Sequence, residues 1–431
     1  MSYASLSQHS LVPTPWRQRL LRYLVVAGPG LIVMVADNDA GAVSTYTQAG
    51  AQYGTRLLWV LLALLPITYF VQEMVARLGI ATGQGHARMI YQRFGTWWGR
   101  FSLADLMVVN FLTLVTEFAA VALAARGLGV PPAVAVPLAA VGLVLLVGTG
   151  SYRRWERMTL GLCGLSLAWF GLAWMVGPSW GAVLRDTVAP SLPAGGLTGQ
   201  LVFVVIAIVG TTIAPWQLFF QQSCVADKRL RFADLGAARL DTFIGAVAVV
   251  AFAGCMMLVG DALHRAGGSY QDPAQMAEAL GDTLGWAGTK LILLLMCNAA
   301  VLGATAISLS SAWAWGEAIG GRSTLEARIS EAPGFYAAYA VCVAAAAGVV
   351  LVPGAPLQAI ILGVQVLAGI MLPSAIVFLQ LLLNDKEMLG ERFVNRPWNN
   401  WVNWGCIGLL FALSLILAAQ VLLPGLFPTT A

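Results

Sequence analysis

Long apolar runs alternate with short polar connections along the whole chain. Each run is about as long as a helix needs to be to cross a bilayer. The pattern predicts eleven spans, near residues 24–47, 56–79, 102–126, 131–149, 158–177, 199–222, 237–260, 287–316, 335–352, 356–383 and 401–424. No Pro- or Ser-rich linker divides them. The sequence therefore predicts one all-α polytopic membrane domain over residues 1–431, without a second, soluble domain.

The composition supports a membrane protein. Of the 431 residues, 59% are hydrophobic and only 10% are charged, whereas about 25% of the residues of a soluble domain are charged. The net charge of +4 gives no sign of a nucleic-acid partner. The six cysteines stand singly and are interpreted as reduced packing residues. No catalytic constellation or nucleotide motif is present, so we do not expect an enzyme.

Lys and Arg residues are concentrated in every second connection, which predicts an orientation. They precede the first span and follow spans 2, 4, 6, 8 and 10. By the positive-inside rule, the N-terminus is cytoplasmic and the C-terminus lies outside a bacterial-type inner (plasma) membrane. The basic N-terminal stretch leads straight into span 1, without a cleavable signal. The long loop 261–286 is predicted to be a solvated external connector, with a short amphipathic helix as the alternative.

The first span is interrupted by acidic residues. After the apolar residues 31–36 come Asp37, Asn38 and Asp39, followed by Gly41. Insertion of a carboxylate at this depth costs about 2.5–3.5 kcal/mol, and such residues are usually functional. Unwound backbone is tolerated in a membrane only where it lines a buried or wet cavity. We therefore predict a discontinuous helix whose exposed carbonyl groups and Asp39 hold a cation.

The sixth span is interrupted as well, by Gly210, two threonines and Pro215. Proline lacks an amide donor and so frees a carbonyl group one turn earlier. Two broken helices five spans apart are typical of an inverted repeat with a site at the bilayer midplane. Residues 24–180 and 199–383 are predicted to be the two five-helix repeats, and residues 401–424 an additional helix 11.

The first two spans carry the segment GPG…VA..D.G…T..QAGAQYG, with LLWVLL and ARLGIATG after it. This segment resembles the first two helices of the Nramp (natural resistance-associated macrophage protein) family of divalent metal transporters. The resemblance extends more weakly over most of the chain, including residues 372–390. It implies a LeuT-like fold, with broken helices 1 and 6, and a transported divalent cation rather than a cofactor.

The family signatures place a metal site in this sequence. Asp-Pro-Gly-Asn of helix 1 falls on residues 39–42 and Met-Pro-His of helix 6 on residues 214–216. The resemblance implies three ligands: the Asp39 carboxylate and the backbone oxygens of Ala36 and Thr211. The Asn and Met ligands are replaced by Ala42 and Ala214.

The missing thioether changes the expected selectivity. A thioether is a soft ligand that suits transition metals. Without it, and without the carboxamide, the site is wider and built of oxygen, which suits Mg²⁺ with several retained waters. These departures resemble the Nramp-related magnesium transporters. Gln217, two residues after Pro215, is a further candidate ligand through a metal-bound water.

The residues linked to proton movement in the family are largely absent. The helix-6 His is Trp216, and of the helix-3 acids only one is retained, as Glu117. We therefore expect facilitated import driven by the membrane potential. Two charges moving inward across 100 mV gain about 4–5 kcal/mol.

Alternative roles remain open for several residues. Asp39 is either a ligand or a cap of the second half-helix. Glu117 either faces the cavity or is a neutral packing residue, and Asp37 either binds the ion, directly or through water, or caps a helix. Gln217 either binds a metal-bound water or hydrogen-bonds freed backbone. Trp216 is expected to fill space beside the site, and Asn38 to line the cavity.

The sequence thus predicts a monomeric secondary transporter that imports Mg²⁺ and Mn²⁺ by alternating access, with the divalent ion and the lipid bilayer as its partners. One alternative is a proton-coupled Mn²⁺/Fe²⁺ importer. Another is a Na⁺-coupled symporter of a small solute, because such carriers share the fold.

Overall fold

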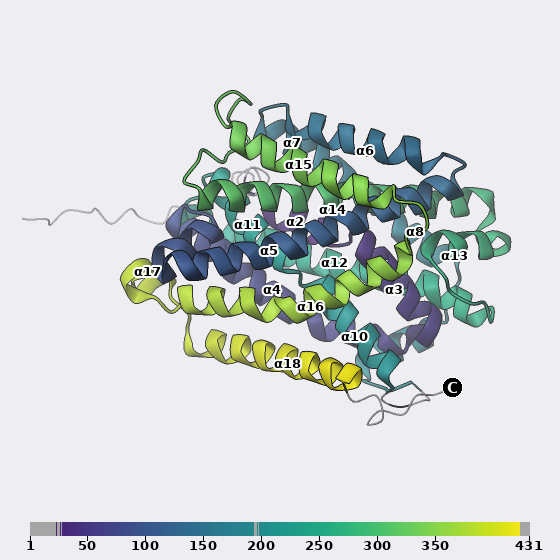
Figure 1. Cartoon of the computed structure of the whole chain (residues 1–431). Helices are drawn as coiled ribbons and strands as arrows, with labels where there is room; N and C mark the ends of the chain where they lie inside the picture. Colours follow the sequence, from purple (N-terminus) through teal and green to yellow (C-terminus); the bar gives the residue numbers. More distant parts are fainter. Residues whose placement is uncertain (1–22, 24–25, 27, 194–195, 197, 423–431) are drawn as a thin grey trace, which may run out of the picture.

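The structure, a computed structural model, describes residues 23, 26, 28–193, 196 and 198–422. These residues form a bundle of helices without strands (Figure 1). The helices are α2 (Pro29–Ala36), α3 (Ala40–Tyr53), α4 (Leu58–Thr82), α5 (His86–Gly127), α6 (Pro132–Val147), α7 (Tyr152–Leu165), α8 (Ala168–Met175), α9 (Trp180–Val188), α10 (Gly199–Thr212), α11 (Pro215–Asp227), α12 (Leu235–Arg265), α13 (Pro273–Ala279), α14 (Gly281–Ala318), α15 (Pro333–Val350), α16 (Leu357–Leu382), α17 (Lys386–Phe393) and α18 (Pro397–Leu422), with short 3₁₀ turns at Gly54–Leu57 and Phe232–Asp234.

Each of the eleven predicted spans falls on one helix or on a pair of helices joined at a break. Within the described residues, eight helical stretches are long and apolar enough to cross a membrane, and α6 is a shorter apolar helix. Spans 1, 5 and 6 are the divided ones, as α2–α3, α7–α8 and α10–α11. The all-α prediction is confirmed. The division into two repeats stays a prediction.

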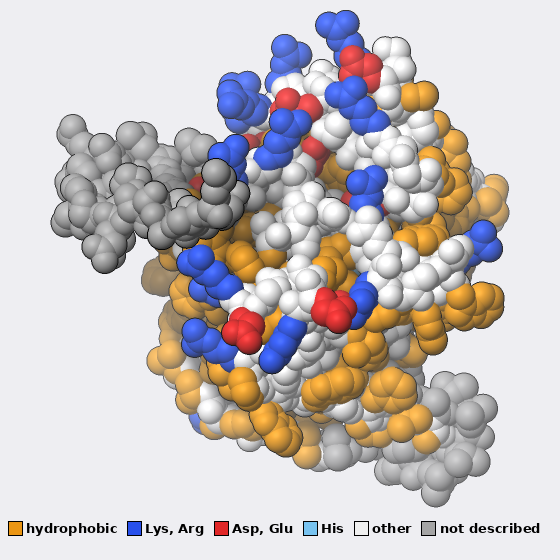
Figure 2. Space-filling view, turned by 90° about the vertical axis from the view of Figure 1, so that its left-hand side faces the viewer, with side chains coloured by type: hydrophobic (Ala, Val, Ile, Leu, Met, Phe, Trp, Pro, Cys, Tyr) orange, Lys and Arg blue, Asp and Glu red, His pale blue; other side chains and the backbone are white. Residues whose placement is uncertain are grey.

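Charged side chains gather at one end of the bundle. Figure 2 looks onto the end where α17 lies, and Lys and Arg side chains are spread over this face while hydrophobic side chains occupy the flanks. Such a distribution is typical of a bundle whose flanks face lipid and whose basic end faces the cytoplasm. The orientation of the termini stays a prediction.

The backbones of α3 and α12 approach closely because small residues lie between them. A Cβ atom on Gly50 would lie 2.0 Å from the Met257 carbonyl oxygen, and one on Gly260 would lie 2.1 Å from the Thr47 carbonyl oxygen. Glycine at both positions therefore permits the contact, as small residues commonly do between membrane helices. This contact holds the half-helix after the first break against α12.

The loop 261–286 differs from the predicted solvated connector. It contains the short helix α13, in which Met276 and Ala277 are fully buried. Tyr270, before this helix, donates a hydrogen bond to the Ser44 carbonyl oxygen of α3 (3.1 Å). The prediction was wrong because the few apolar residues of a mostly polar loop suffice to pack it onto the bundle.

Candidate metal site at two helix breaks

The first break lies between α2 and α3. In a continuous helix the Ala40 amide would donate to the Ala36 carbonyl oxygen. Here it donates instead to Glu117 Oε2 of α5, at 3.2 Å. The Ala36 carbonyl group therefore loses its helical partner and is available at the break, as its predicted ligand role requires.

Asp39 starts the second half of the broken helix. Its backbone is extended (φ −73°, ψ −171°), and its Oδ1 accepts a hydrogen bond from the Ala42 amide at 2.9 Å. Asp39 is thus the N-cap of α3, where a negative charge also meets the positive end of the helix dipole. The capping role that the sequence left open is present, and it occupies only one of the two carboxylate oxygens.

A second acid lies directly beside Asp39. The Asp39 and Glu117 carboxyl groups both accept hydrogen bonds from amides in the first turn of α3, those of Ala42 and Ala40. Both pack against the backbone of α14, where a Cβ atom on Gly303 would lie 2.7 Å from Asp39 Cβ and 2.8 Å from Glu117 Cδ. Glu117 is therefore part of the break, where it is fully buried and hydrogen-bonded to the Ala40 amide. Two carboxyl groups in contact, shielded from water, need a proton or a cation between them.

Asp37 and Gln217 connect the two breaks. The Gln217 amide group donates to Asp37 Oδ1, and Gln72 Nε2 of α4 donates to Gln217 Oε1 at 2.8 Å. In this conformation the Gln217 oxygen accepts from Gln72, and both of these hydrogen bonds of the Gln217 side chain go to other side chains. Asp37 Oδ2 is buried and has no partner among the described residues. The sequence reasoning missed Gln72, although a glutamine within an apolar span was a visible signal.

The second break lies between α10 and α11. Pro215 is the first residue of α11 and has no N–H, so the Thr211 carbonyl oxygen lacks the donor that would face it in a continuous helix. Ile213 and Ala214 are extended. The hydroxyl groups of Tyr46 in α3 and Thr212 in α10 form a hydrogen bond of 2.7 Å between the two broken helices. The Ala36 and Thr211 carbonyl groups are thus freed by two different local causes.

The remaining predicted residues surround these groups. Trp216 is completely buried, and its ring packs edge-on against Phe220 with centroids 6.0 Å apart, so it fills space as expected. Asn38 Nδ2 donates to the Val249 carbonyl oxygen of α12 at 3.4 Å. Ala42 and Ala214 are buried and leave the positions of the two missing ligands without polar atoms.

The groups at the two breaks that could bind a cation are oxygen atoms. Several buried side-chain oxygens close to the breaks have no partner among the described residues, among them Asp37 Oδ2, Asn38 Oδ1, Glu117 Oε1 and Thr211 Oγ1. Unpartnered buried polar atoms are unfavourable, and a hydrated cation would satisfy them. The described residues contain no group of three or more His, Cys, Asp or Glu side chains placed to hold a metal.

The sequence matches a family model over most of its length. Residues 30–420 match the family model described as natural resistance-associated macrophage protein-like. The divalent metal cation transporter MntH 1 of Pseudomonas aeruginosa is 28% identical over 445 aligned residues, which cover 96% of this chain and 95% of the relative.

Two solved structures share the fold. A manganese transporter of Eremococcus coleocola has a TM-score of 0.77 at 19% identity, covering 100% of this chain and 93% of the other. MhsT in complex with L-phenylalanine has a TM-score of 0.60 at 13% identity, covering 91% and 98%. At these identities the likeness concerns the fold alone, and it confirms the expected LeuT-like architecture.

Proposed function

Because the chain belongs to the natural resistance-associated macrophage protein (Nramp) family, we propose that it imports divalent metal ions across a bacterial-type cell membrane by alternating access. The relative from Pseudomonas aeruginosa is named as a transporter, not as an enzyme. One observation carries the proposal most directly. Both breaks free a carbonyl group, on Ala36 and on Thr211, and the buried Asp39 carboxylate lies at the first of them.

The proposed cargo is Mg²⁺, with Mn²⁺ also accepted. Asp39 and the carbonyl oxygens of Ala36 and Thr211 bind the ion, and Gln217 contacts it through water after releasing Gln72. Asp37, Asn38 and Glu117 line the hydrated space. All of these are oxygen ligands, and Mg²⁺ keeps several waters when one or two carboxylates bind it. Ala42 and Ala214 leave room for those waters.

The proposed driving force is the membrane potential. No histidine stands at the helix-6 position, where Trp216 is fully buried. A proton shared by Asp39 and Glu117 is displaced when the cation binds, because the cation then balances both carboxylates. If that proton leaves and returns on the same side of the membrane, no net proton movement accompanies the ion.

A second candidate is a proton-coupled importer of Mn²⁺ or Fe²⁺. Two observations favour it: the solved relative from Eremococcus coleocola is named a manganese transporter, and the Asp39–Glu117 pair provides an acid beside the ion that is able to carry a proton. The two candidates differ in ion preference and in proton movement, and both properties are measurable in one experiment.

The deciding experiment is uptake by the purified protein in liposomes, with Mg²⁺ and Mn²⁺ compared and the internal pH recorded. An imposed potential, negative inside, drives the cation. Mg²⁺ uptake without a pH change supports the proposal. Mn²⁺ uptake that resists excess Mg²⁺ and acidifies the lumen establishes the second candidate instead. No uptake of either ion contradicts both.

A further inference from the structure

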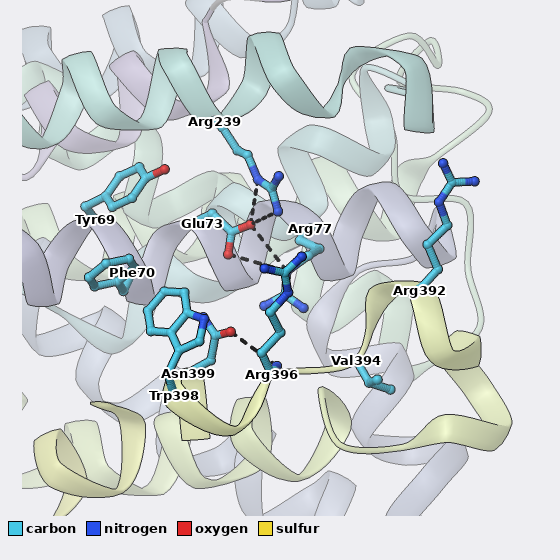
Figure 3. Close-up of a pocket in the computed structure, with 10 residues that line it drawn as sticks. All are labelled: Tyr69, Phe70, Glu73, Arg77, Arg239, Arg392, Val394, Arg396, Trp398 and Asn399. Atoms are coloured by element: carbon cyan, nitrogen blue, oxygen red, sulfur yellow. Dashed lines mark hydrogen bonds and ion pairs between the residues drawn. The ribbon is translucent and has the colours of Figure 1, made fainter. Parts of the chain in front are cut away.

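A strongly basic pocket lies at the charged end of the bundle, apart from the two breaks (Figure 3). Its volume is about 300 Å³, and it opens between α4, the start of α12 and the segment that joins α17 to α18. The lining residues are Tyr69, Phe70, Glu73, Arg77, Arg239, Arg392, Val394, Arg396, Trp398 and Asn399. Four arginines therefore share the pocket with one carboxylate.

Glu73 compensates only part of this charge. Its Oε1 accepts from Arg239 Nε at 2.9 Å and lies 3.3 Å from Arg77 Nε, so two guanidinium groups share one carboxylate. Arg77 is nearly buried and is held in place by Asn395, whose Oδ1 accepts from the second guanidinium NH₂ group at 2.7 Å. The floor of the pocket is thus a fixed positive charge.

Two further arginines stand at the rim. Arg392 and Arg396 are exposed, and no carboxylate among the described residues pairs with either. Arg392 lies over the Phe232 ring, 3.8 Å from its centroid. The charges of Arg396 and Arg239 both repel that of Arg77. Like charges held together in this way favour a bound anion, and the planar guanidinium group fits phosphate through two parallel hydrogen bonds.

The pocket has an aromatic side that continues into an apolar surface. Phe70 and Trp398 pack edge-to-face with their centroids 5.0 Å apart. Beyond Arg239, the exposed face of α12 is apolar: Leu240, Phe243, Ile244 and Val247. Arginines and aromatic rings beside a lipid-facing apolar strip are typical of the depth of phospholipid headgroups.

We propose that this pocket binds the phosphate group of an anionic phospholipid, whose acyl chains lie along the apolar face of α12. Arg392 and Arg396 at the rim bind the negative phosphate, and the positive charge of Arg77 and Arg239 at the floor adds to the attraction. The aromatic side contacts the glycerol region. A soluble phosphate compound shares the phosphate chemistry but not the need for an adjoining apolar strip. The inference does not depend on which ion the protein transports.

The test measures lipid binding directly. The purified, delipidated full chain in detergent is titrated with dioleoylphosphatidylglycerol, and bound lipid is counted by native mass spectrometry. Dioleoylphosphatidylcholine and inorganic phosphate form the parallel arms. The variant R392Q/R396Q removes the charges of the two exposed rim arginines. R153Q/R154Q removes two exposed charges outside the pocket and is the matched control.

We expect phosphatidylglycerol to bind in preference to phosphatidylcholine, with R392Q/R396Q weakening it roughly tenfold and R153Q/R154Q leaving it unchanged. Three results overturn the proposal. If R392Q/R396Q binds phosphatidylglycerol as tightly as R153Q/R154Q does, the lipid does not bind in this pocket. Displacement of the lipid by millimolar inorganic phosphate assigns the site to a soluble anion. Equal binding of the two lipids shows that the charge of the pocket plays no part.

Discussion

The two helix breaks open the backbone in the same way but contribute different chemistry. Each frees one carbonyl group, on Ala36 and on Thr211. The first break also carries Asp37 and Asp39, whereas the second has no ionisable side chain between its glycine and Gln217. One broken helix therefore supplies the negative charge of the site. The second supplies backbone geometry and the dipole of its freed carbonyl group.

The two breaks also restart their helices by different devices. Asp39 caps α3 with a charged oxygen, so its carboxylate serves the fold and the site together. Pro215 starts α11 by fixing its own φ angle and by having no N–H to satisfy. Substitutions at the first break therefore change charge, and substitutions at the second change geometry.

The largest effect is expected from Asp39→Asn. Asparagine caps a helix as well as aspartate does, so α3 and the fold are retained while the charge is lost. Removing a buried charge partner costs about 2–5 kcal/mol, and uptake in liposomes should fall by roughly a hundredfold or more. Thermal unfolding checks the fold, and Asp39→Ala, which loses cap and charge together, is the comparison. Near-normal uptake by the Asn variant would show that Asp39 serves chiefly as a cap.

Glu117→Gln should have the next largest effect. A glutamine oxygen still accepts the hydrogen bond of the Ala40 amide, but the second acid beside Asp39 disappears. We expect uptake to slow by roughly tenfold, about 1.4 kcal/mol, because one negative charge no longer attracts the ion. Initial rates between pH 5.5 and 8 should also vary less than in the wild type. An unchanged rate with an unchanged pH profile would place Glu117 outside the transport pathway.

Ala214→Met would give the second break a soft side-chain ligand in addition to the Thr211 carbonyl group. A thioether favours Mn²⁺ over Mg²⁺, so the ratio of Mn²⁺ to Mg²⁺ uptake should rise by about five- to tenfold, close to 1 kcal/mol. Competition uptake measures this ratio. Ala214→Leu adds similar bulk without sulfur and should lower the uptake of both ions alike. The same shift in both variants would assign the effect to size.

Pro215→Ala should have the smallest effect. The new amide is able to donate to the Thr211 carbonyl oxygen and close the second break, which removes one neutral ligand. Such a hydrogen bond contributes about 1 kcal/mol, so the concentration for half-maximal uptake should rise by a few fold. Pro333→Ala, at the start of α15, is the control. If affinity is unchanged in both variants, the Thr211 carbonyl group does not bind the ion.

The positions of both breaks were readable from local sequence, because their causes are local. Carboxylates within an apolar run and a proline within a helix act on the backbone within one turn. The freed carbonyl groups of Ala36 and Thr211 follow from hydrogen-bond spacing alone, and the structure shows both donors missing or redirected. The acceptor that replaces the Ala36 carbonyl oxygen, however, is the Glu117 carboxylate of α5, 77 positions away along the chain from Ala40.

Contacts between side chains that are far apart in the sequence could not be predicted from the sequence. No pattern in the sequence joins Gln72 to Gln217, or Asp39 to Glu117, since each pair depends on how distant helices are oriented. The same holds for the arginine pocket, whose members come from three separate segments. A short run such as Met276 and Ala277 is also too small to indicate helix α13 by periodicity, and its packing onto α3 became clear only in the folded chain.

The long apolar helices, the location of the two breaks and the oxygen-rich, thioether-free set of candidate ligands were predictable from the sequence, because hydrophobic length, backbone donors and residue type are local properties. Which groups face one another became known from the folded chain: Glu117 at the Ala40 amide, Gln217 between Asp37 and Gln72, and four arginines in one pocket. Those contacts depend on helix packing, which sums many weak interactions over the whole bundle.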